Sequence, residues 1–103
     1  MIQTRVADLV VAIAVASSVM DKPIHPGLIS IGEVGLAGEV RRVGGLEKRL
    51  AEAARLGFTK AIVPADTPNR GKDLKPMDMQ AKYGLRVFAA GDIRAALLAA
   101  GIA

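Results

Sequence analysis

Residues 29–56 of this chain read ISIGEVGLAGEVRRVGGLEKRLAEAARL, and this stretch decides the fold. It opens with β-branched residues typical of a strand, and Val40 and Val43 flank a basic pair in a second strand. Between these strands, Gly35 and Gly38 can adopt a positive φ at no steric cost, as a hairpin turn requires. The pattern therefore predicts a β-hairpin.

A helix is predicted to follow the hairpin directly, entered through Gly44 and Gly45. Apolar residues then recur at helical spacing and form one stripe, namely Leu46, Leu50, Ala53 and Gly57. Charged residues occupy most of the remaining positions. The hairpin and helix form a unit with one face to bury.

Residues 32–64, GEVGLAGEVRRVGGLEKRLAEAARLGFTKAIVP, resemble the signature stretch of the Lon-protease-like domain, in the form found in the RadA (Sms) family of bacterial DNA repair ATPases. The resemblance implies an α/β fold of the ribosomal protein S5 domain 2-like type, a small mixed sheet with packed helices. It also implies that residues 1–103 are the C-terminal part of that domain, because the family domain begins with strands upstream of the first helix. We expect an unpaired strand edge that promotes dimerisation or strand swapping.

Composition sets limits on the class of protein. The 103 residues suffice for one domain, and with 51% hydrophobic but only 3% aromatic residues the core must be aliphatic. The absence of cysteine excludes disulfides and thiolate metal sites, and a single histidine argues against structural zinc. The net charge of +4 favours an anionic partner, nucleic acid first, although solubility alone also explains it.

The N-terminal region predicts a helix from about Arg5 to Met20, with Thr4 as its cap and the Asp8 carboxylate stabilising its first turn. Residues 9–16 are apolar on nearly every side, which predicts a central, buried helix. This run is about half the length that a bilayer span requires, and no signal peptide is apparent. We therefore expect a cytoplasmic chain with no membrane partner.

The C-terminal half predicts alternating strands and helices. Strands are expected at residues 60–64 and 85–89, an exposed loop at 65–76, a short helix at 77–83 closed by Gly84, and a last helix capped by Asp92. Such alternation is typical of an α/β layer.

Peptidase chemistry of the Lon type needs a serine nucleophile within reach of a lysine base. In the family the lysine directly follows Gly-Gly-Leu, where this chain has Glu47; Lys48 cannot replace it, because one helical step turns a side chain by about 100°. The position of the family's serine nucleophile falls at Val6 in this chain. The resemblance therefore implies a non-catalytic relative.

Other residues give weak signals for chemistry. Ser17, Ser18 and Ser30 are best explained by packing or local hydrogen bonds, and His25 by a loop role. Glu33 and Glu39 flank the predicted turn and are interpreted as structural. The glycines lie between strands with no Gly-Lys-Ser/Thr after them, so no nucleotide site is predicted.

Basic residues are the remaining candidates, because phosphate contacts need only positive charge and reach. The predicted DNA-binding residues are Arg41, Arg42, Lys48, Arg49, Arg55, Arg70, Lys72 and Lys75. Acidic residues are interleaved among them and aromatic residues are scarce, which favours contact with a duplex backbone over base stacking. A solvated charged face is the alternative.

The resemblance also implies a function. RadA-type proteins join a zinc motif, an ATPase core and this Lon-like domain, form hexameric rings, and promote branch migration during recombinational repair. There the Lon-like domain takes part in assembly and in binding duplex or branched DNA, while ATP, Mg and Zn belong to parts absent from this chain. Two alternatives stay open: a fragment of a Ser-Lys peptidase, or an assembly module of a magnesium-chelatase-like ATPase.

Overall fold

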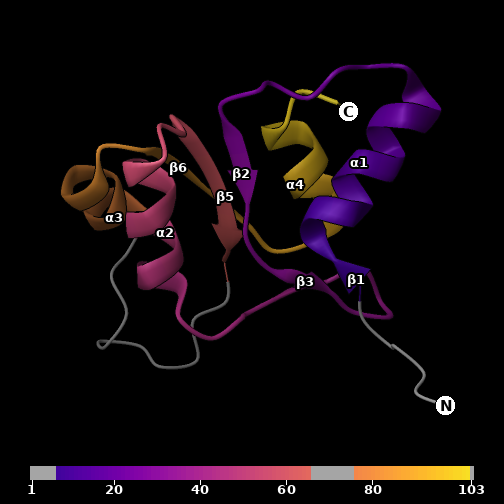
Figure 1. Cartoon of the computed structure of the whole chain (residues 1–103). Coiled ribbons are helices and arrows are strands. Elements are labelled where there is room, and N and C mark those ends of the chain that lie inside the picture. Colours follow the sequence, from indigo (N-terminus) through magenta and orange to yellow (C-terminus); the bar gives the residue numbers. More distant parts are fainter. Residues whose placement is uncertain (1–6, 66–75, 103) are drawn as a thin grey trace, which may run out of the picture.

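The computed structural model describes residues 7–65 and 76–102, which form three layers, helices on either side of a central sheet (Figure 1). The helices are α1 (Leu9–Met20), α2 (Leu46–Arg55), α3 (Pro76–Tyr83) and α4 (Ile93–Ala99). The strands are β1 (Ala7–Asp8), β2 (Leu28–Ser30), β3 (Glu33–Val34), β4 (Val40–Arg41), β5 (Lys60–Pro64) and β6 (Arg86–Ala90). The predicted α/β class is confirmed.

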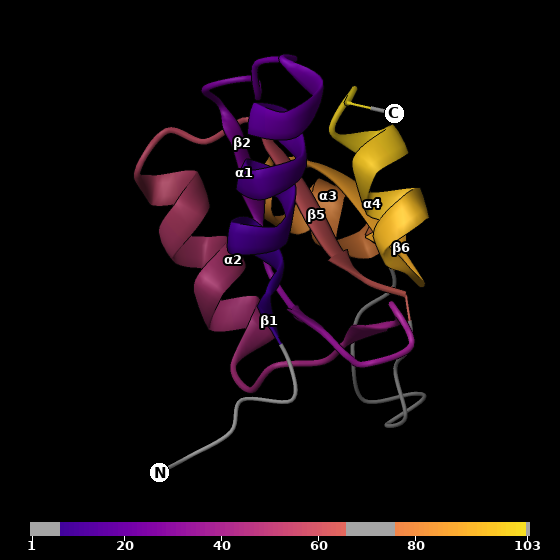
Figure 2. The same ribbon diagram turned by 90° about the vertical axis from the view of Figure 1, so that its right-hand side faces the viewer.

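The strands of the expected mixed sheet are divided between two small sheets. A parallel sheet has the order β2-β5-β6, and an antiparallel sheet has the order β1-β3-β4. Figures 1 and 2 show α2 and α3 on one face of the parallel sheet and α1 and α4 on the other. The chain passes from one sheet to the other between β2 and β3, so the predicted hairpin consists of β3 and β4 alone.

Each face of the parallel sheet has its own hydrophobic core. The α1–α4 side buries Leu9, Ile13, Val40, Ile62, Ala90, Ala96 and Ile102, and the α2–α3 side buries Ile31, Leu50, Ala53, Ala61, Val63 and Leu85. Along β5, Ile62 belongs to the first cluster, while Ala61 and Val63 belong to the second. A strand buried on both faces needs a continuous apolar run, as β5 has.

Several predicted elements are confirmed. The stripe of α2 is buried at Leu50 and Ala53. The Asp92 carboxylate caps α4 by accepting a hydrogen bond of 2.8 Å from the Ala95 amide. Gly84 follows α3 with a φ of 73°, the left-handed conformation that ends a helix. These signals are local, so the sequence alone is sufficient to place them.

The predicted start of α1 is wrong. The helix begins at Leu9 rather than Arg5, and Asp8 is its N-cap, accepting a hydrogen bond of 2.9 Å from the Val10 amide. Ala7 and Asp8 instead pair with β3. Thr4, the predicted cap, lies outside the described residues.

The predicted burial of α1 is also wrong. Of its residues only Leu9 and Ile13 are buried, and Val11, Val15 and Val19 are 55%, 57% and 79% exposed. The physical reason is that α1 packs against α4 and the sheets on one side, and no other described element covers its opposite side. Among the described residues, no helix is long and apolar enough to cross a bilayer.

The turn between β3 and β4 uses its glycines differently from the prediction. Gly38 has the expected positive φ, at 85°, but Gly35 does not. A Cβ at Gly35 would lie 2.2 Å from the carboxylate of the exposed Glu39 side chain, which would have to shift to make room. Glu39 in turn accepts a hydrogen bond of 3.1 Å from the Ala37 amide. Its role is therefore structural, as predicted.

Candidate functional site

A recess, here called the β2 groove, runs along β2 between α1 and α2. It consists of two cavities of about 500 Å³ and about 230 Å³ that share Val10, Ile29 and Ser30. The smaller cavity is lined mainly by apolar side chains, including those of Ile24, Leu28 and Phe58. One end of the groove is therefore hydrophobic.

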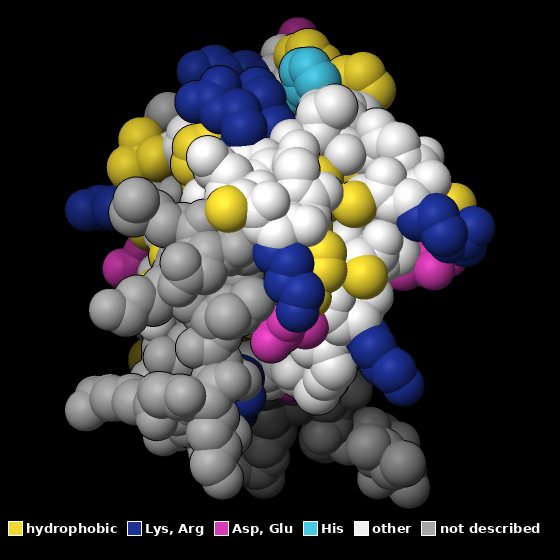
Figure 3. Space-filling view, turned by 90° about the vertical axis from the view of Figure 1, so that its left-hand side faces the viewer, with side chains coloured by type: hydrophobic (Ala, Val, Ile, Leu, Met, Phe, Trp, Pro, Cys, Tyr) yellow, Lys and Arg dark blue, Asp and Glu magenta, His cyan; other side chains and the backbone are white. Residues whose placement is uncertain are grey.

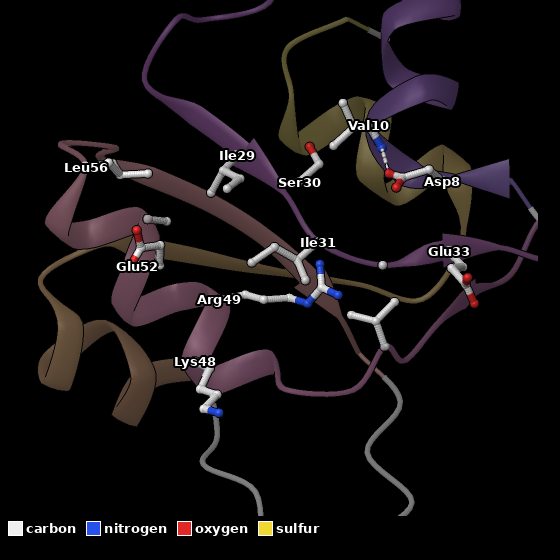
Figure 4. Close-up of a pocket in the computed structure, with 13 residues that line it drawn as sticks. Asp8, Val10, Ile29, Ser30, Ile31, Glu33, Lys48, Arg49, Glu52 and Leu56 are labelled. Atoms are coloured by element: carbon white, nitrogen blue, oxygen red, sulfur yellow. Dashed lines mark hydrogen bonds between the residues drawn. The ribbon is translucent and has the colours of Figure 1, made fainter.

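The other end of the groove is charged. Asp8, Glu33, Lys48, Arg49 and Glu52 line the larger cavity together with apolar residues of β2 and α2. In Figure 4, the Arg49 side chain extends toward Ile31, whereas that of Lys48 points away from Ile31. Arg49 is oriented by a hydrogen bond of 3.2 Å from its Nε to the Gly44 carbonyl. Both signs of charge are present, so this end is not a simple anion site.

Glu47, where the sequence resemblance predicts the family's lysine position, is held by α3. Its carboxylate accepts hydrogen bonds from the Tyr83 hydroxyl at 2.8 Å and from the Lys82 ammonium at 3.3 Å. The Tyr83 hydrogen bond is the main cause that lowers the pKa of Glu47; desolvation acts against it, and Lys82 lowers the pKa further. Glu47 is thus a charged hydrogen-bond acceptor held by two residues of α3. Val6 lies outside the described residues.

We predict that Tyr83→Phe raises the pKa of Glu47 toward its ordinary value, because it removes the hydrogen bond with the largest effect on this pKa. A carbon-13 NMR titration of the Glu47 carboxyl measures this pKa. Lys82→Met is the matched comparison and should shift it less; an equal or larger shift would contradict the assignment. Because the pKa is lower in the folded chain, the contact stabilises the fold above the unfolded-state pKa, about 4.3, and this contribution is lost as pH falls through the folded pKa.

The serines and the histidine differ in their surroundings. The Ser17 hydroxyl donates to the Lys22 carbonyl after α1, and His25 Nδ1 accepts from the Gly27 amide at 2.9 Å, both local roles as predicted. Ser30 is different, because it is 9% exposed and no described residue hydrogen-bonds its hydroxyl. Of the two predicted explanations, packing and local hydrogen bonds, the burial of Ser30 agrees with packing.

The predicted DNA-binding residues are only partly brought together. Arg41 and Arg42 lie at β4, and exposed Lys48 and Arg49 follow in the first turns of α2. Arg55, at the other end of α2, forms an ion pair with Glu52. The remaining three candidates, Arg70, Lys72 and Lys75, lie outside the described residues. On the face that Figure 3 shows, Lys and Arg side chains form separate groups with acidic side chains beside several of them.

Two features of the site escaped the sequence reasoning. Tyr83 contacts Glu47 from 36 positions away, and no local pattern connects them. The β2 groove depends on how α1 and α2 are placed, which their separate periodicities do not encode. Within residues 7–65 and 76–102, no group of three His, Asp or Glu side chains is arranged to hold a metal ion.

The fold and a family comparison define the class of protein. Residues 5–101 match the Lon protease (S16) C-terminal proteolytic domain, so this chain belongs to that family. Within it, the chain is similar to proteins named DNA repair protein RadA. It is 50% identical over 91 residues to that of Mycolicibacterium smegmatis, which covers 88% of this chain and 17% of the relative.

Other relatives carry the same name. The Mycobacterium tuberculosis H37Rv protein is 46% identical over 91 residues, covering 88% of this chain and 17% of the relative. The Streptococcus pneumoniae protein is 55% identical over 60 residues, covering 58% of this chain and 14% of the relative. The chain thus spans about one sixth of the length of its RadA relatives, and its resemblance to the RadA family is confirmed.

Proposed function

We propose that this chain is the Lon-like part of a RadA-type DNA repair and recombination protein, where it acts as an oligomerisation scaffold and a surface for the DNA backbone. The observation that carries this proposal is the similarity to RadA proteins along most of the chain. A role in DNA repair requires contact with DNA, with partner subunits, or with both.

A peptidase role is disfavoured by the chemistry at Glu47. A Lon-type dyad needs a lysine that gives up its proton, and Glu47 has the opposite charge. Its carboxylate is also engaged by Tyr83 and Lys82 rather than directed into the β2 groove. These contacts support a non-catalytic role.

The best supported DNA-contacting residues are Arg41, Lys48 and Arg49. All three are exposed, and they lie close together along the chain at the β4–α2 connection. Glu33, the cross-strand partner of Arg41, lines the same cavity as Lys48 and Arg49, which brings the three side chains to one region of the surface. Duplex DNA presents a phosphate charge about every 1.7 Å of helix axis, so a short basic cluster suffices for several contacts.

We expect the variant Arg41→Ala/Lys48→Ala/Arg49→Ala to bind duplex and branched DNA roughly ten- to a hundredfold more weakly, if each contact contributes about 0.5–1 kcal/mol. Fluorescence anisotropy of a labelled duplex and a labelled four-way junction at low salt measures this. Arg94→Ala, an exposed arginine on α4, is the control and should bind normally. Equal weakening of DNA binding in the triple variant and in Arg94→Ala would show that binding depends only on net charge.

Assembly is supported by the exposed valines of α1. Val11, Val15 and Val19 follow each other at intervals of four and form one apolar stripe on the surface. Stripes of this kind are unusual on a monomer and typical of surfaces that contact another protein. We assign this stripe to the contact between neighbouring subunits.

Replacing the stripe with glutamine, Val11→Gln/Val15→Gln/Val19→Gln, should reduce self-association without loss of helix, because glutamine is a good helix former. Sedimentation velocity over a range of concentrations measures the association, and circular dichroism checks the helix. Leu36→Gln, which changes an 82% exposed leucine at the hairpin tip, is the control. Unchanged association in the α1 variant would contradict the assignment.

A further inference from the structure

Lys60 and Arg86 form a basic pair at the amino-terminal edge of the parallel sheet. They are the first residues of β5 and β6, and they are direct neighbours in the parallel register. Their side chains therefore leave the sheet next to each other on the same face. Ile62 and Phe88, two residues further along each strand, belong to the α1–α4 core, so the pair lies on the α1–α4 side of the sheet.

No acidic side chain neutralises this pair in the part of the chain that the structure describes. Arg55 and Lys82 are each paired with a glutamate, but neither Lys60 nor Arg86 forms an ion pair or a side-chain hydrogen bond there. In particular, neither side chain donates to the last carbonyls of α4, a structural role that basic residues near a helix end often have. Like charges on neighbouring strands repel each other, and a bound anion removes this cost.

The Phe88 ring orients Arg86 without using its hydrogen-bond donors. The central guanidinium carbon of Arg86 lies 5.7 Å from the centre of the Phe88 ring, which is a cation–π contact. Such a contact leaves the N–H donors of the guanidinium free, and their fork matches two oxygens of one phosphate. Arg86 is exposed, and the half-buried Lys60 adds a point charge beside it. The pair thus has the donors and the charge of a phosphate site.

This pair is separated from the basic cluster of Arg41, Lys48 and Arg49. In Figure 1, the β4–α2 connection enters α2 at one end, and β5 begins beyond the other end. The ten residues of α2 alone span about 15 Å. The pair also lies on the α1–α4 side of the parallel sheet, whereas α2 covers the opposite face (Figure 2). A duplex is stiff over such lengths, so one seated on the cluster does not bend around the sheet to reach the pair.

We propose that Lys60 and Arg86 bind a phosphate of the DNA backbone and form a second DNA contact, separate from the basic cluster at the β4–α2 connection. This inference rests on the proposed function, because it requires that the domain meets DNA. It adds a surface on the other side of the parallel sheet. A second duplex, or another arm of a branched DNA, occupies this surface.

An NMR titration of the 103-residue chain with a short duplex at low salt examines both contacts in one experiment. We expect the amide signals of Lys60 and Arg86, and the side-chain Nε–H signal of Arg86, to shift together with the amide signals of Lys48 and Arg49. Shifts confined to Lys48 and Arg49 would overturn this proposal and leave the proposed function standing. Shifts confined to Lys60 and Arg86 would support it and contradict the first cluster, and no shift at either place would overturn both.

The variant Lys60→Ala/Arg86→Ala should bind duplex DNA roughly five- to thirtyfold more weakly, with the same contribution per contact as in the first cluster. The slope of log affinity against log salt should become shallower by up to about 1.8, because each phosphate contact contributes about 0.9. Arg86→Lys keeps the charge but loses the guanidinium fork, so it should leave the slope unchanged while still weakening binding. Fluorescence anisotropy measures all three proteins.

The matched control is Arg55→Ala/Lys82→Ala, which removes the same amount of positive charge. Both residues are already paired with glutamates on the α2–α3 side, so the control should bind the duplex more tightly than Lys60→Ala/Arg86→Ala does. Circular dichroism and urea denaturation show whether each variant keeps its fold. Equal weakening of DNA binding in the two double variants, or unchanged binding in Lys60→Ala/Arg86→Ala, would overturn the proposal.

Discussion

Replacing Leu50 with alanine is expected to lower the free energy of unfolding by about 3 kcal/mol. Leu50 is fully buried in the cluster beneath α2, together with Ile31, Val63 and Leu85. The substitution removes buried methyl groups and leaves a cavity that the neighbouring strands cannot fill. In a domain of this size, such a loss is a large part of the total stability.

The matched control is Leu56→Ala, at the end of the same helix. Leu56 is 62% exposed, so its truncation should cost well under 1 kcal/mol. Urea denaturation followed by circular dichroism measures both variants, and an unchanged m-value shows that the unfolding reaction is the same. Similar losses in the two variants would contradict the placement of α2.

The second large effect is expected at Gly32. The substitution Gly32→Ala should lower the free energy of unfolding by about 2–3 kcal/mol. Its φ is 149°, and an added Cβ would lie 3.1 Å from a Val40 methyl and 3.3 Å from the Arg41 carbonyl oxygen. The Gly32 carbonyl also accepts a hydrogen bond of 3.0 Å from the Leu9 amide, at the start of α1. This glycine therefore joins the two sheets and the first helix.

Gly44→Ala provides the control for the backbone effect. Gly44 has no positive φ, and nothing lies within 4 Å of a Cβ added there. Its replacement should change the free energy of unfolding by less than about 0.5 kcal/mol. Urea denaturation of the two alanine variants makes the comparison, and equal stabilities would show that Gly32 carries no special backbone constraint.

Local signals explain why much of the fold was predictable. The α2 stripe, the Asp92 cap and the apolar run of β5 each require only neighbouring residues, and each is observed. The position of Glu47 directly after Gly44, Gly45 and Leu46 is likewise read from the sequence, and its assignment to the family's lysine position stays a prediction. These features depend on spacing along the chain and not on how elements are placed in space.

Long-range packing explains the failures. The composition of α1 predicted burial on several faces, but whether Val15 is covered depends on which elements surround the helix. The place of β2 at one side of the described parallel sheet follows from strand order, which propensities do not give. The contact of Glu47 with Tyr83 likewise requires α2 and α3 to be neighbours. For the predicted DNA-binding residues, closeness along the chain predicted closeness in the fold only at the β4–α2 connection.

The most direct test of the central claim, that this domain contacts the DNA backbone, is the salt dependence of DNA binding by the chain itself. We predict that the logarithm of the affinity falls linearly with the logarithm of salt concentration, with a slope of about −0.9 per phosphate engaged. In the Arg41→Ala/Lys48→Ala/Arg49→Ala variant the slope should become shallower by up to about 2.7. An affinity that is undetectable at low salt, or a slope unchanged in this variant, would contradict the claim.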